Sequence, residues 1–333
     1  MRFPVSLALI LSQLAIHASA VSKPQPEQNI LRKRPIPLVI WHGLGDDYGS
    51  SGIQNISNLA QLVHPGTYVY VISLGSSRAT DLRASYFGNL NEQLEEVCKK
   101  LGTEQILSTA PSINALGFSQ GGQFLRAYVE RCNFPPVHNL VTFGSQHNGI
   151  SSFQGCSTTG DWLCRAGESL LRWGTWSRFV QSRFVPAQYY RDPADMEQYR
   201  AYSNFLADIN NERASKNVTY KENMAKLNKF AMYMFENDKM MVPKESSQFA
   251  EVNTTDGTVT PLKERRIFKE DWLGLRELDT KGKLDLKTTP GGHMELTDET
   301  LRTVFQEYFA PIELGGDVHA MRTDADTQKV LSG

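Results

Sequence analysis

Ser119 is the first residue whose surroundings indicate chemistry. It is the centre of Gly117-Phe118-Ser119-Gln120-Gly121, which fits the pattern G-x-S-x-G. In that pattern a tight turn from a strand to a helix projects the serine hydroxyl above a sheet, where the helix dipole favours negative charge. The five residues alone are a weak signal, but Ser119 also follows an apolar run and precedes a helical pattern. We therefore predict that Ser119 is a nucleophile rather than part of a flexible turn.

A serine hydroxyl needs a base, and in hydrolases with this turn the acid follows the serine and the histidine comes last. Of the seven histidines, His293 and His319 are the two that follow an acid candidate in the C-terminal third of the chain. His319 lies in a polar tail, whereas His293 lies in a glycine-rich loop after the strand-like residues 284–288. A base must come from a loop at the carboxyl edge of the sheet, so we predict His293. The alternative is a hydrogen-bonded surface histidine.

The acid is expected at the end of the strand that precedes this histidine. Residues 230–235 are apolar and strand-like, and Glu236 and Asp238 follow them. Either carboxylate could orient the histidine and stabilise its protonated ring. Asp238 is favoured because it lies beyond the end of the strand, in the loop. Three other aspartates lie in polar segments with no strand before them and are weaker candidates: Asp256, Asp271 and Asp298.

Two backbone N–H groups are expected to stabilise an oxyanion beside Ser119. The first apolar run ends in the sequence WHGLGD, residues 41–46, which is where hydrolases of this type offer one donor. We assign that donor to Leu44, because the glycines on either side of it let the backbone approach closely. The second donor is expected to be Gln120, the residue after the nucleophile. We interpret His42 as a structural residue rather than a second base.

These residues must be carried by a sheet. Five apolar runs have the length of strands: residues 38–41, 68–74, 113–118, 140–143 and 230–235. Several are nearly continuous in apolar character, as strands buried on both faces of a parallel sheet must be. Helical patterns at residues 90–101 and 123–131 lie between them. The alternation predicts an α/β fold with a mostly parallel central sheet flanked by helices, over residues 37–310.

The alternation lapses between about residues 150 and 225, which are rich in aromatic side chains and hold three of the five tryptophans. This stretch is interpreted as a second small core of packed helices, as a helical insertion that carries an apolar groove above the site, or as both. Residues 21–36 are polar and contain prolines, so we expect a flexible lead-in. The polar residues 311–333 are expected to form a mobile tail.

The N-terminus has the features of a secretory signal peptide over residues 1–20. A positive start leads into the apolar residues 5–16, and Ala18-Ser19-Ala20 provides a cleavage site. The apolar run is shorter than the roughly 20 residues that a membrane-spanning helix needs. We therefore expect no transmembrane anchor and a location in the secretory pathway, either in a lysosomal or vacuolar lumen or outside the cell. Three glycosylation sequons agree with this location, at Asn55, Asn217 and Asn253.

The chain has four cysteines: Cys98, Cys132, Cys156 and Cys164. In an oxidising lumen an even number makes two disulfides plausible, with three pairings open, of which Cys98–Cys132 with Cys156–Cys164 is the most local. A zinc site does not fit their spacing, and we expect neither metal nor cofactor. The net charge is −1 and there is no long basic run, which argues against nucleic acid as a partner.

With these residues in view, the chain resembles the palmitoyl-protein thioesterases of the lysosome over about residues 37–310. The segment with FLADIN is more specific than the serine motif. The resemblance rests on PLVIWHGLGD, INALGFSQGGQFLRAYVERC, VTFGSQHNGI, RDPADMEQYRAYSNFLADINNER, FENDKMMVP and GGHMEL. It implies an α/β-hydrolase fold whose helical insertion forms the acyl groove. It also implies Ser119, Asp238 and His293 as a triad, Leu44 and Gln120 as oxyanion donors, and the most local cysteine pairing.

The expected reaction is removal of long acyl chains, such as palmitate, from cysteines of S-acylated proteins or peptides. Ser119 would attack the thioester carbonyl with His293 as base, and water would release the fatty acid from the acyl-enzyme. A secreted lipase or carboxylesterase acting on oxygen esters is the alternative enzyme, because the same triad serves both. A non-catalytic acyl-binding protein is a third hypothesis, against which the intact triad speaks.

Overall fold

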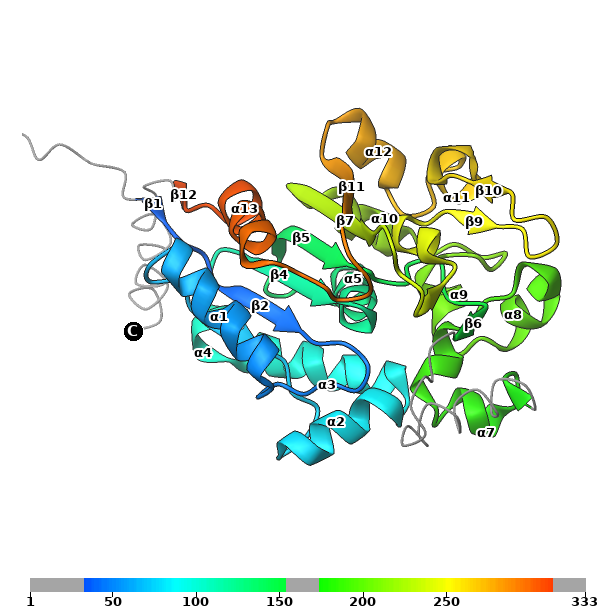
Figure 1. Cartoon of the computed structure of the whole chain (residues 1–333), viewed down its shortest axis with the longest axis horizontal. Helices are drawn as coiled ribbons and strands as arrows, with labels where there is room; N and C mark the ends of the chain where they lie inside the picture. The colour runs from blue at the N-terminus through cyan, green and yellow to red at the C-terminus, as the bar shows by residue number, and fades with distance from the viewer. Residues whose placement is uncertain (1–32, 154–173, 314–333) are drawn as a thin grey trace, which may run out of the picture. The chain divides into compact units, whose positions relative to one another are not determined.

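A six-stranded parallel sheet organises the protein. The structure is a computed structural model that describes residues 33–153 and 174–313 (Figure 1). The strands lie in the order β11-β7-β5-β4-β2-β3, and every neighbouring pair is parallel. Their bounds are Leu38–Trp41 (β2), Val69–Val71 (β3), Ile113–Phe118 (β4), Val137–Phe143 (β5), Lys229–Phe235 (β7) and Leu284–Thr289 (β11). The predicted fold class, an α/β fold with a parallel central sheet, is confirmed.

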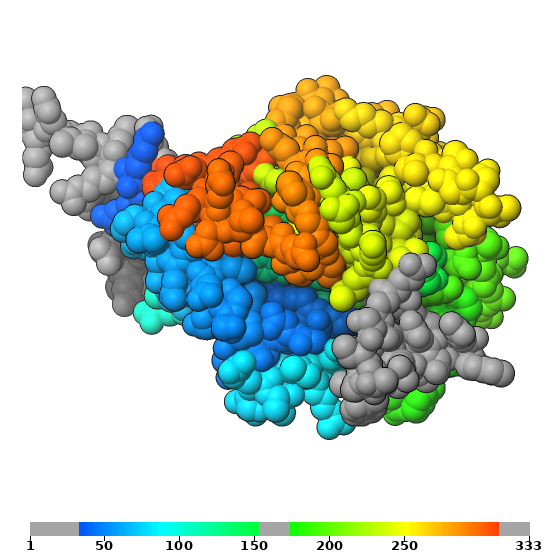
Figure 2. Space-filling view, in the orientation of Figure 1, coloured from blue at the N-terminus to red at the C-terminus, as the bar shows by residue number. Residues whose placement is uncertain are grey.

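Helices cover both faces of the sheet because its strands are apolar on both faces. In β2, Leu38 and Ile40 face a core shared with α1 (Ser51–Val63) and α13 (Asp298–Tyr308). The alternate residues Val39 and Trp41 belong to the opposite core, with α3 (Leu90–Thr103) and α5 (Gln120–Arg131). This alternation follows from the two-residue period of a strand. Helices α1 and α13 adjoin on the face seen in Figure 2.

The segment between β5 and β7 is mostly helical where the structure describes it. Its buried aromatic residues, among them Tyr189, Tyr199 and Phe205, join the same core as α3 and α5. Its elements are β6 (Ser152–Phe153), α7 (Arg178–Gln181), η1 (Val185–Tyr189), η2 (Pro193–Asp195), α8 (Met196–Tyr202), α9 (Leu206–Ile209) and α10 (Val218–Ala225). This stretch is the predicted helical insertion.

Smaller elements complete the described part of the chain. Two short helices, α2 (Arg78–Tyr86) and α4 (Gln105–Ser108), flank α3 in the sequence. The remainder lie after β7: β8 (Met241–Val242), η3 (Lys244–Gln248), β9 (Glu251–Val252), β10 (Val259–Thr260), η4 (Leu262–Glu264), α11 (Arg266–Lys269) and α12 (Leu275–Thr280). Strand β8 pairs with β6, and β9 pairs with β10.

Two short strands extend the domain slightly beyond the bounds expected from hydropathy. Lys33–Arg34 (β1), in the predicted lead-in, pairs in antiparallel fashion with Ile312–Glu313 (β12), in the predicted tail. Backbone pairing, which a hydropathy pattern does not reveal, therefore orders the inner ends of both segments. The predicted signal peptide, most of the lead-in and tail, and His319 lie outside the described residues.

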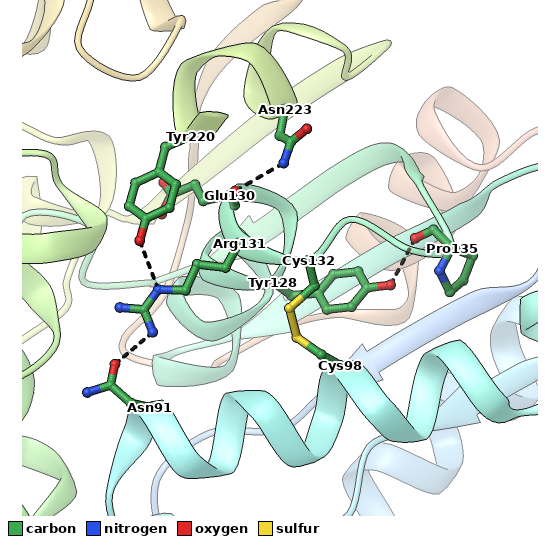
Figure 3. The surroundings of a disulfide bond; sticks show 9 residues. All are labelled: Asn91, Cys98, Tyr128, Glu130, Arg131, Cys132, Pro135, Tyr220 and Asn223. Atoms are coloured by element: carbon green, nitrogen blue, oxygen red, sulfur yellow. Dashed lines mark hydrogen bonds between the residues drawn. A yellow bond between two sulfur atoms is a disulfide. The ribbon is translucent and has the colours of Figure 1, made fainter. Parts of the chain in front are cut away.

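A disulfide joins Cys98 of α3 to Cys132, which follows the end of α5 (Figure 3). The Cα atoms are 6.0 Å apart, and this is the pair that the sequence favoured for these two cysteines. Arg131, beside Cys132, donates hydrogen bonds to Asn91 of α3 and to Tyr220 of α10. The disulfide and the hydrogen bond between Arg131 and Asn91 therefore both hold α3 to the end of α5. Cys156 and Cys164 lie outside the described residues.

Candidate active site

Ser119 lies in the sharp turn between β4 and α5. Its backbone has φ 52° and ψ −126°, a conformation that non-glycine residues rarely adopt. The turn is held on one side by a hydrogen bond from Ser119 N to Phe143 O of the neighbouring strand, at 2.8 Å. Because the side chain does not cap the helix, its hydroxyl is available to other partners. The turn has the geometry that the G-x-S-x-G pattern predicts.

Two glycines allow α5 to lie directly against the strands. A Cβ atom at Gly117 would be 2.5 Å from Gly122 N, and one at Gly121 would be 2.7 Å from Trp41 C. Both distances are far shorter than any real contact of a Cβ atom, and the opposing atoms are backbone. The turn therefore depends on these two positions having no side chain.

The three residues predicted as a triad are brought together at the carboxyl ends of three strands of the sheet. His293 Nε2 lies 3.0 Å from Ser119 Oγ, and His293 Nδ1 lies 2.6 Å from Asp238 Oδ2. Ser119 follows β4, Asp238 follows β7 and His293 follows β11. Parallel strands present their carboxyl ends at one edge, so residues far apart in the chain meet there.

Asp238 is fixed independently of the histidine. Its Oδ1 accepts hydrogen bonds from the backbone N–H groups of Met240 (2.9 Å) and Met241 (3.0 Å), which leaves Oδ2 facing His293. Asp238 is buried, whereas Glu236, the other carboxylate considered from the sequence, is exposed. The choice of Asp238 over Glu236 therefore agrees with the geometry.

Two backbone N–H groups near Ser119 lack acceptors among the residues that the structure describes. One is that of Leu44, in the loop after β2, and the other is that of Gln120, the first residue of α5. The first N–H groups of a helix have no partner within the helix. Gly43 lies close to the serine, since a Cβ atom at Gly43 would be 3.1 Å from Ser119 Cβ. These are the two donors that the sequence predicted for an oxyanion.

A chain of hydrogen bonds that the sequence analysis missed holds the side chain of Gln120. The Tyr189 hydroxyl donates to Gln120 Oε1 at 3.1 Å, and Gln120 Nε2 donates to Ser85 O at 3.0 Å. Burial raises the pKa of Tyr189, so its hydroxyl keeps its proton and remains a donor. The side chain of Gln146, in the loop after β5, acts to lower this pKa but does not outweigh burial. A polar run directly after the buried strand 140–143 was the available signal for Gln146.

A cavity of about 440 Å³ opens beside Ser119 and His293. This volume is in the range of about 300–1,000 Å³ that is usual for small-molecule sites. Its described lining includes two carboxylates, Asp46 and Asp298. Most of the wall is apolar: Ile53, Ile56, Phe118, Met240, Met241, Met294, Leu296 and Leu301.

Helix α1 supplies Ile53 and Ile56 of this wall, and α13 supplies Leu301. Of the helical insertion, which was expected to form the acyl groove, Tyr189 is the described residue that lines the cavity. Asn55, one of the three sequon asparagines, lies on α1 and also lines it. All three sequon asparagines are exposed, including Asn217 and Asn253. Their glycosylation stays a prediction.

The described part of the chain holds neither a metal-binding cluster nor a helix that could cross a membrane. No cluster of three or more histidine, cysteine, aspartate or glutamate side chains there is arranged to hold a metal ion. None of the helices there combines the length and the apolar character that crossing a membrane requires.

Comparison with known proteins gives consistent matches. The family model for palmitoyl protein thioesterase matches residues 37–293, a range that includes both oxyanion candidates and the triad. Palmitoyl-protein thioesterase 1 of Caenorhabditis elegans is 37% identical over 280 residues, 83% of this chain and 92% of that protein. Palmitoyl-protein thioesterase 3 of Dictyostelium discoideum is 33% identical, covering 84% and 91%. The lysosomal thioesterase PPT2 homolog of Drosophila melanogaster is 31% identical, covering 83% and 91%.

Proposed function

From the chain's membership of the palmitoyl protein thioesterase family, we propose that this thioesterase cleaves long-chain acyl groups, such as palmitate, from cysteines of proteins or peptides. The observation that carries the proposal is the hydrogen-bonded series Ser119–His293–Asp238 beside a mainly apolar cavity. In this proposal Ser119 is the nucleophile, His293 the base and Asp238 the group that orients the histidine.

The first half of the reaction forms an acyl-enzyme. Ser119 Oγ attacks the thioester carbonyl carbon while His293 Nε2 accepts the hydroxyl proton, and Asp238 stabilises the resulting imidazolium. The carbonyl oxygen becomes an oxyanion that accepts hydrogen bonds from the N–H groups of Leu44 and Gln120. The carbon–sulfur bond then breaks, and the sulfur takes the proton from His293. A thiol has a pKa of about 8.5, so it leaves readily as a thiolate.

The second half releases the fatty acid. His293 takes a proton from water, and the hydroxide adds to the carbonyl carbon of the acyl-enzyme. The bond from carbon to Ser119 Oγ breaks, and the serine regains the proton from His293. The same oxyanion donors serve both halves, since the charge develops on the same oxygen.

The apolar wall between α1 and α13 supports a site for the acyl chain. Each buried methylene contributes about 0.8 kcal/mol, so a few contacts suffice to separate chain lengths. Gly52 lines the cavity, and a Cβ atom at Gly52 would have nothing within 4 Å. A larger side chain there can therefore project into the cavity without disturbing α1.

We predict that Gly52→Phe lowers kcat/KM for a palmitoyl thioester about tenfold relative to an octanoyl thioester. The reason is that the ring occupies volume that the distal methylenes would fill, and tenfold corresponds to contacts of about two methylenes. The measurement is kcat/KM over a series of acyl lengths. Asn58→Phe is the matched control, because Asn58 is exposed on the same helix and is outside the described cavity lining. An equal fold-decrease in kcat/KM for every acyl length would mean that the acyl chain does not bind beside Gly52.

The location is also part of the proposal. The signal-like residues 1–20 support entry into the secretory pathway, and the name of the Drosophila relative is that of a lysosomal enzyme. We therefore place the enzyme in a lysosomal or vacuolar lumen or outside the cell. Fractionation of cells that express the full chain tests this placement.

The reaction itself is tested by comparing a palmitoyl thioester with the matched oxygen ester. We expect kcat/KM to be at least about tenfold higher for the thioester, because a thiolate is the better leaving group. Enzyme treated with a fluorophosphonate, which labels an activated serine, provides the blank, and peptide mapping should place the label on Ser119. Preference for the oxygen ester would favour a carboxylesterase. Activity that survives complete labelling would contradict the proposed nucleophile.

A further inference from the structure

His42 is a buried histidine in the loop after β2, and both of its ring nitrogens have partners. Nε2 lies 2.9 Å from Asp81 Oδ2 of α2, and Nδ1 lies 3.0 Å from the carbonyl oxygen of Gly43. His42 is 2% exposed and Asp81 is fully buried, so water does not replace either bond. The proposed mechanism uses neither residue.

Both partners of the ring are acceptors. A carbonyl oxygen has no proton to give, and the Asp81 carboxylate already accepts from Leu74 N at Oδ1 (2.6 Å) and from Tyr48 N at Oδ2 (2.8 Å). Burial acts to raise the pKa of Asp81, but these bonds and His42 outweigh it and lower the pKa, so Asp81 is ionised. A neutral imidazole donates through one nitrogen only. Both bonds therefore form only when His42 is an imidazolium.

The charges around His42 favour that form. Burial acts to lower the pKa of His42, but the hydrogen bond and charge of Asp81, with a smaller effect of Asp46, raise it overall. Asp47 is the third carboxylate that interacts with His42, and it is paired with Arg78 at 2.7 Å. The charged groups that face His42 from its own loop and from α2 are thus mainly acidic.

The carbonyl oxygen of Gly43 lies 3.0 Å from His42 Nδ1 and also accepts a longer hydrogen bond, at 3.4 Å, from Asp46 N, so two contacts hold this peptide plane. In a trans peptide the C=O of one residue and the N–H of the next point in opposite directions. Because Gly43 O is turned toward His42, the N–H of Leu44 is turned away from it. Leu44 lines the cavity beside Ser119, and its N–H has no acceptor among the described residues.

We propose that His42, as an imidazolium, is a positioning residue that holds the Gly43–Leu44 peptide with its N–H directed at the oxyanion. This inference rests on the proposed function, in which Leu44 is an oxyanion donor. Loss of the ring proton leaves the remaining N–H with the anionic Asp81. The lone pair of Nδ1 then faces Gly43 O, and the peptide plane keeps only the longer hydrogen bond from Asp46 N.

The consequence is an upper pH limit on activity that His42 sets. A raised pKa means that the charged form of His42 is fully present below about pH 6.5, the ordinary value for histidine, and is lost as pH rises through the raised value. The alkaline fall in kcat then reports loss of the proton from His42.

Two substitutions separate the two bonds of the ring. The amide nitrogen of asparagine lies near the position of Nδ1, so His42→Asn retains a neutral donor for Gly43 O and gives up Asp81. The amide nitrogen of glutamine lies near Nε2, so His42→Gln retains Asp81 and gives up Gly43 O. If the role were only structural, glutamine would be the better replacement, because it keeps the buried carboxylate paired.

We expect instead that His42→Asn is more active than His42→Gln. His42→Asn should keep kcat within about fivefold and lose the alkaline fall, whereas His42→Gln should lose about 10²-fold in kcat with KM little changed, as for a lost oxyanion donor. Thermal unfolding should show the glutamine variant to be at least as stable as the asparagine variant. In enzyme with ¹⁵N-labelled histidine, both ring nitrogens of His42 should carry protons at pH 5.

Three results would overturn the inference: His42→Gln more active than His42→Asn, an unchanged alkaline fall in His42→Asn, or a single ring proton at pH 5. The NMR measurement needs no activity. The proposed function is tested separately, in wild-type enzyme. If activity survives the labelling of Ser119 by a fluorophosphonate, the proposed function is wrong whatever the His42 variants show.

Discussion

Replacing Ser119 by alanine is expected to lower kcat on a palmitoyl thioester by about 10⁴-fold or more, with KM within a fewfold of wild type. The substitution removes the atom that forms the acyl-enzyme, so the loss falls on the chemical step. The apolar cavity and the two N–H donors remain, so the acyl chain still binds. Steady-state kinetics give both parameters, and mass spectrometry of quenched wild-type enzyme should show the acyl group on Ser119.

Asp238, another member of the series, provides the control for this prediction. Asp238→Asn should lower kcat by about 10⁴-fold, because the amide favours the wrong tautomer of His293. Adding Asp238→Asn to Ser119→Ala should cost almost nothing more, since residues that act as a unit are not additive. If the loss in kcat of the double variant equalled the product of the losses of the two single variants, Ser119 and Asp238 would act in different steps. The proposed triad would then be wrong.

Gly117→Ala should be the most damaging small substitution in the described part of the chain for stability. A Cβ atom at Gly117 would lie 2.5 Å from Gly122 N, so β4 and α5 would have to separate. We expect a loss of about 3 kcal/mol or more in the free energy of unfolding, at the upper end for overpacking. Guanidinium unfolding followed by tryptophan fluorescence measures it. Activity should fall as well, because Ser119 lies in the same turn.

Gly52→Ala is the matched control for Gly117→Ala. It makes the same chemical change in the first turn of α1, where a Cβ atom would have nothing within 4 Å. This variant should be up to about 1 kcal/mol more stable than wild type, because alanine restricts the unfolded chain. If both alanine variants had wild-type stability, the tight packing of α5 on β4 would not be required for folding.

The sheet and the meeting of the three residues of the proposed triad were predictable because their signals are local. Strands buried on both faces have continuous apolar sequences. Strands β2 and β4 begin and end at the same residues as the apolar runs that predicted them. Each triad residue was then placed by the strand before it in the sequence. The constraint that all strands are parallel was enough to bring Ser119, Asp238 and His293 to one edge.

The parts that were not predicted depend on how helices pack. The bond between His42 and Asp81 spans 39 residues, and that between Gln120 and Tyr189 spans 69. Neither pair has a sequence pattern, because each side chain is positioned by a different element. The cavity wall formed by α1 and α13 has the same origin, since it exists only after those two helices meet on the sheet.

The strand order has a consequence for biosynthesis. The proposed nucleophile follows β4, near the middle of the sheet, whereas the proposed base follows β11, which is the last strand of the six-stranded sheet in the chain and lies at one end of the strand order. A nascent chain that has reached residue 240 holds the serine turn and Asp238 but has no base. In the proposed mechanism, thioesterase activity therefore requires that β11 and the loop after it have been added. The mechanism thus keeps the nascent chain inactive toward acyl groups until residue 293 has been synthesised.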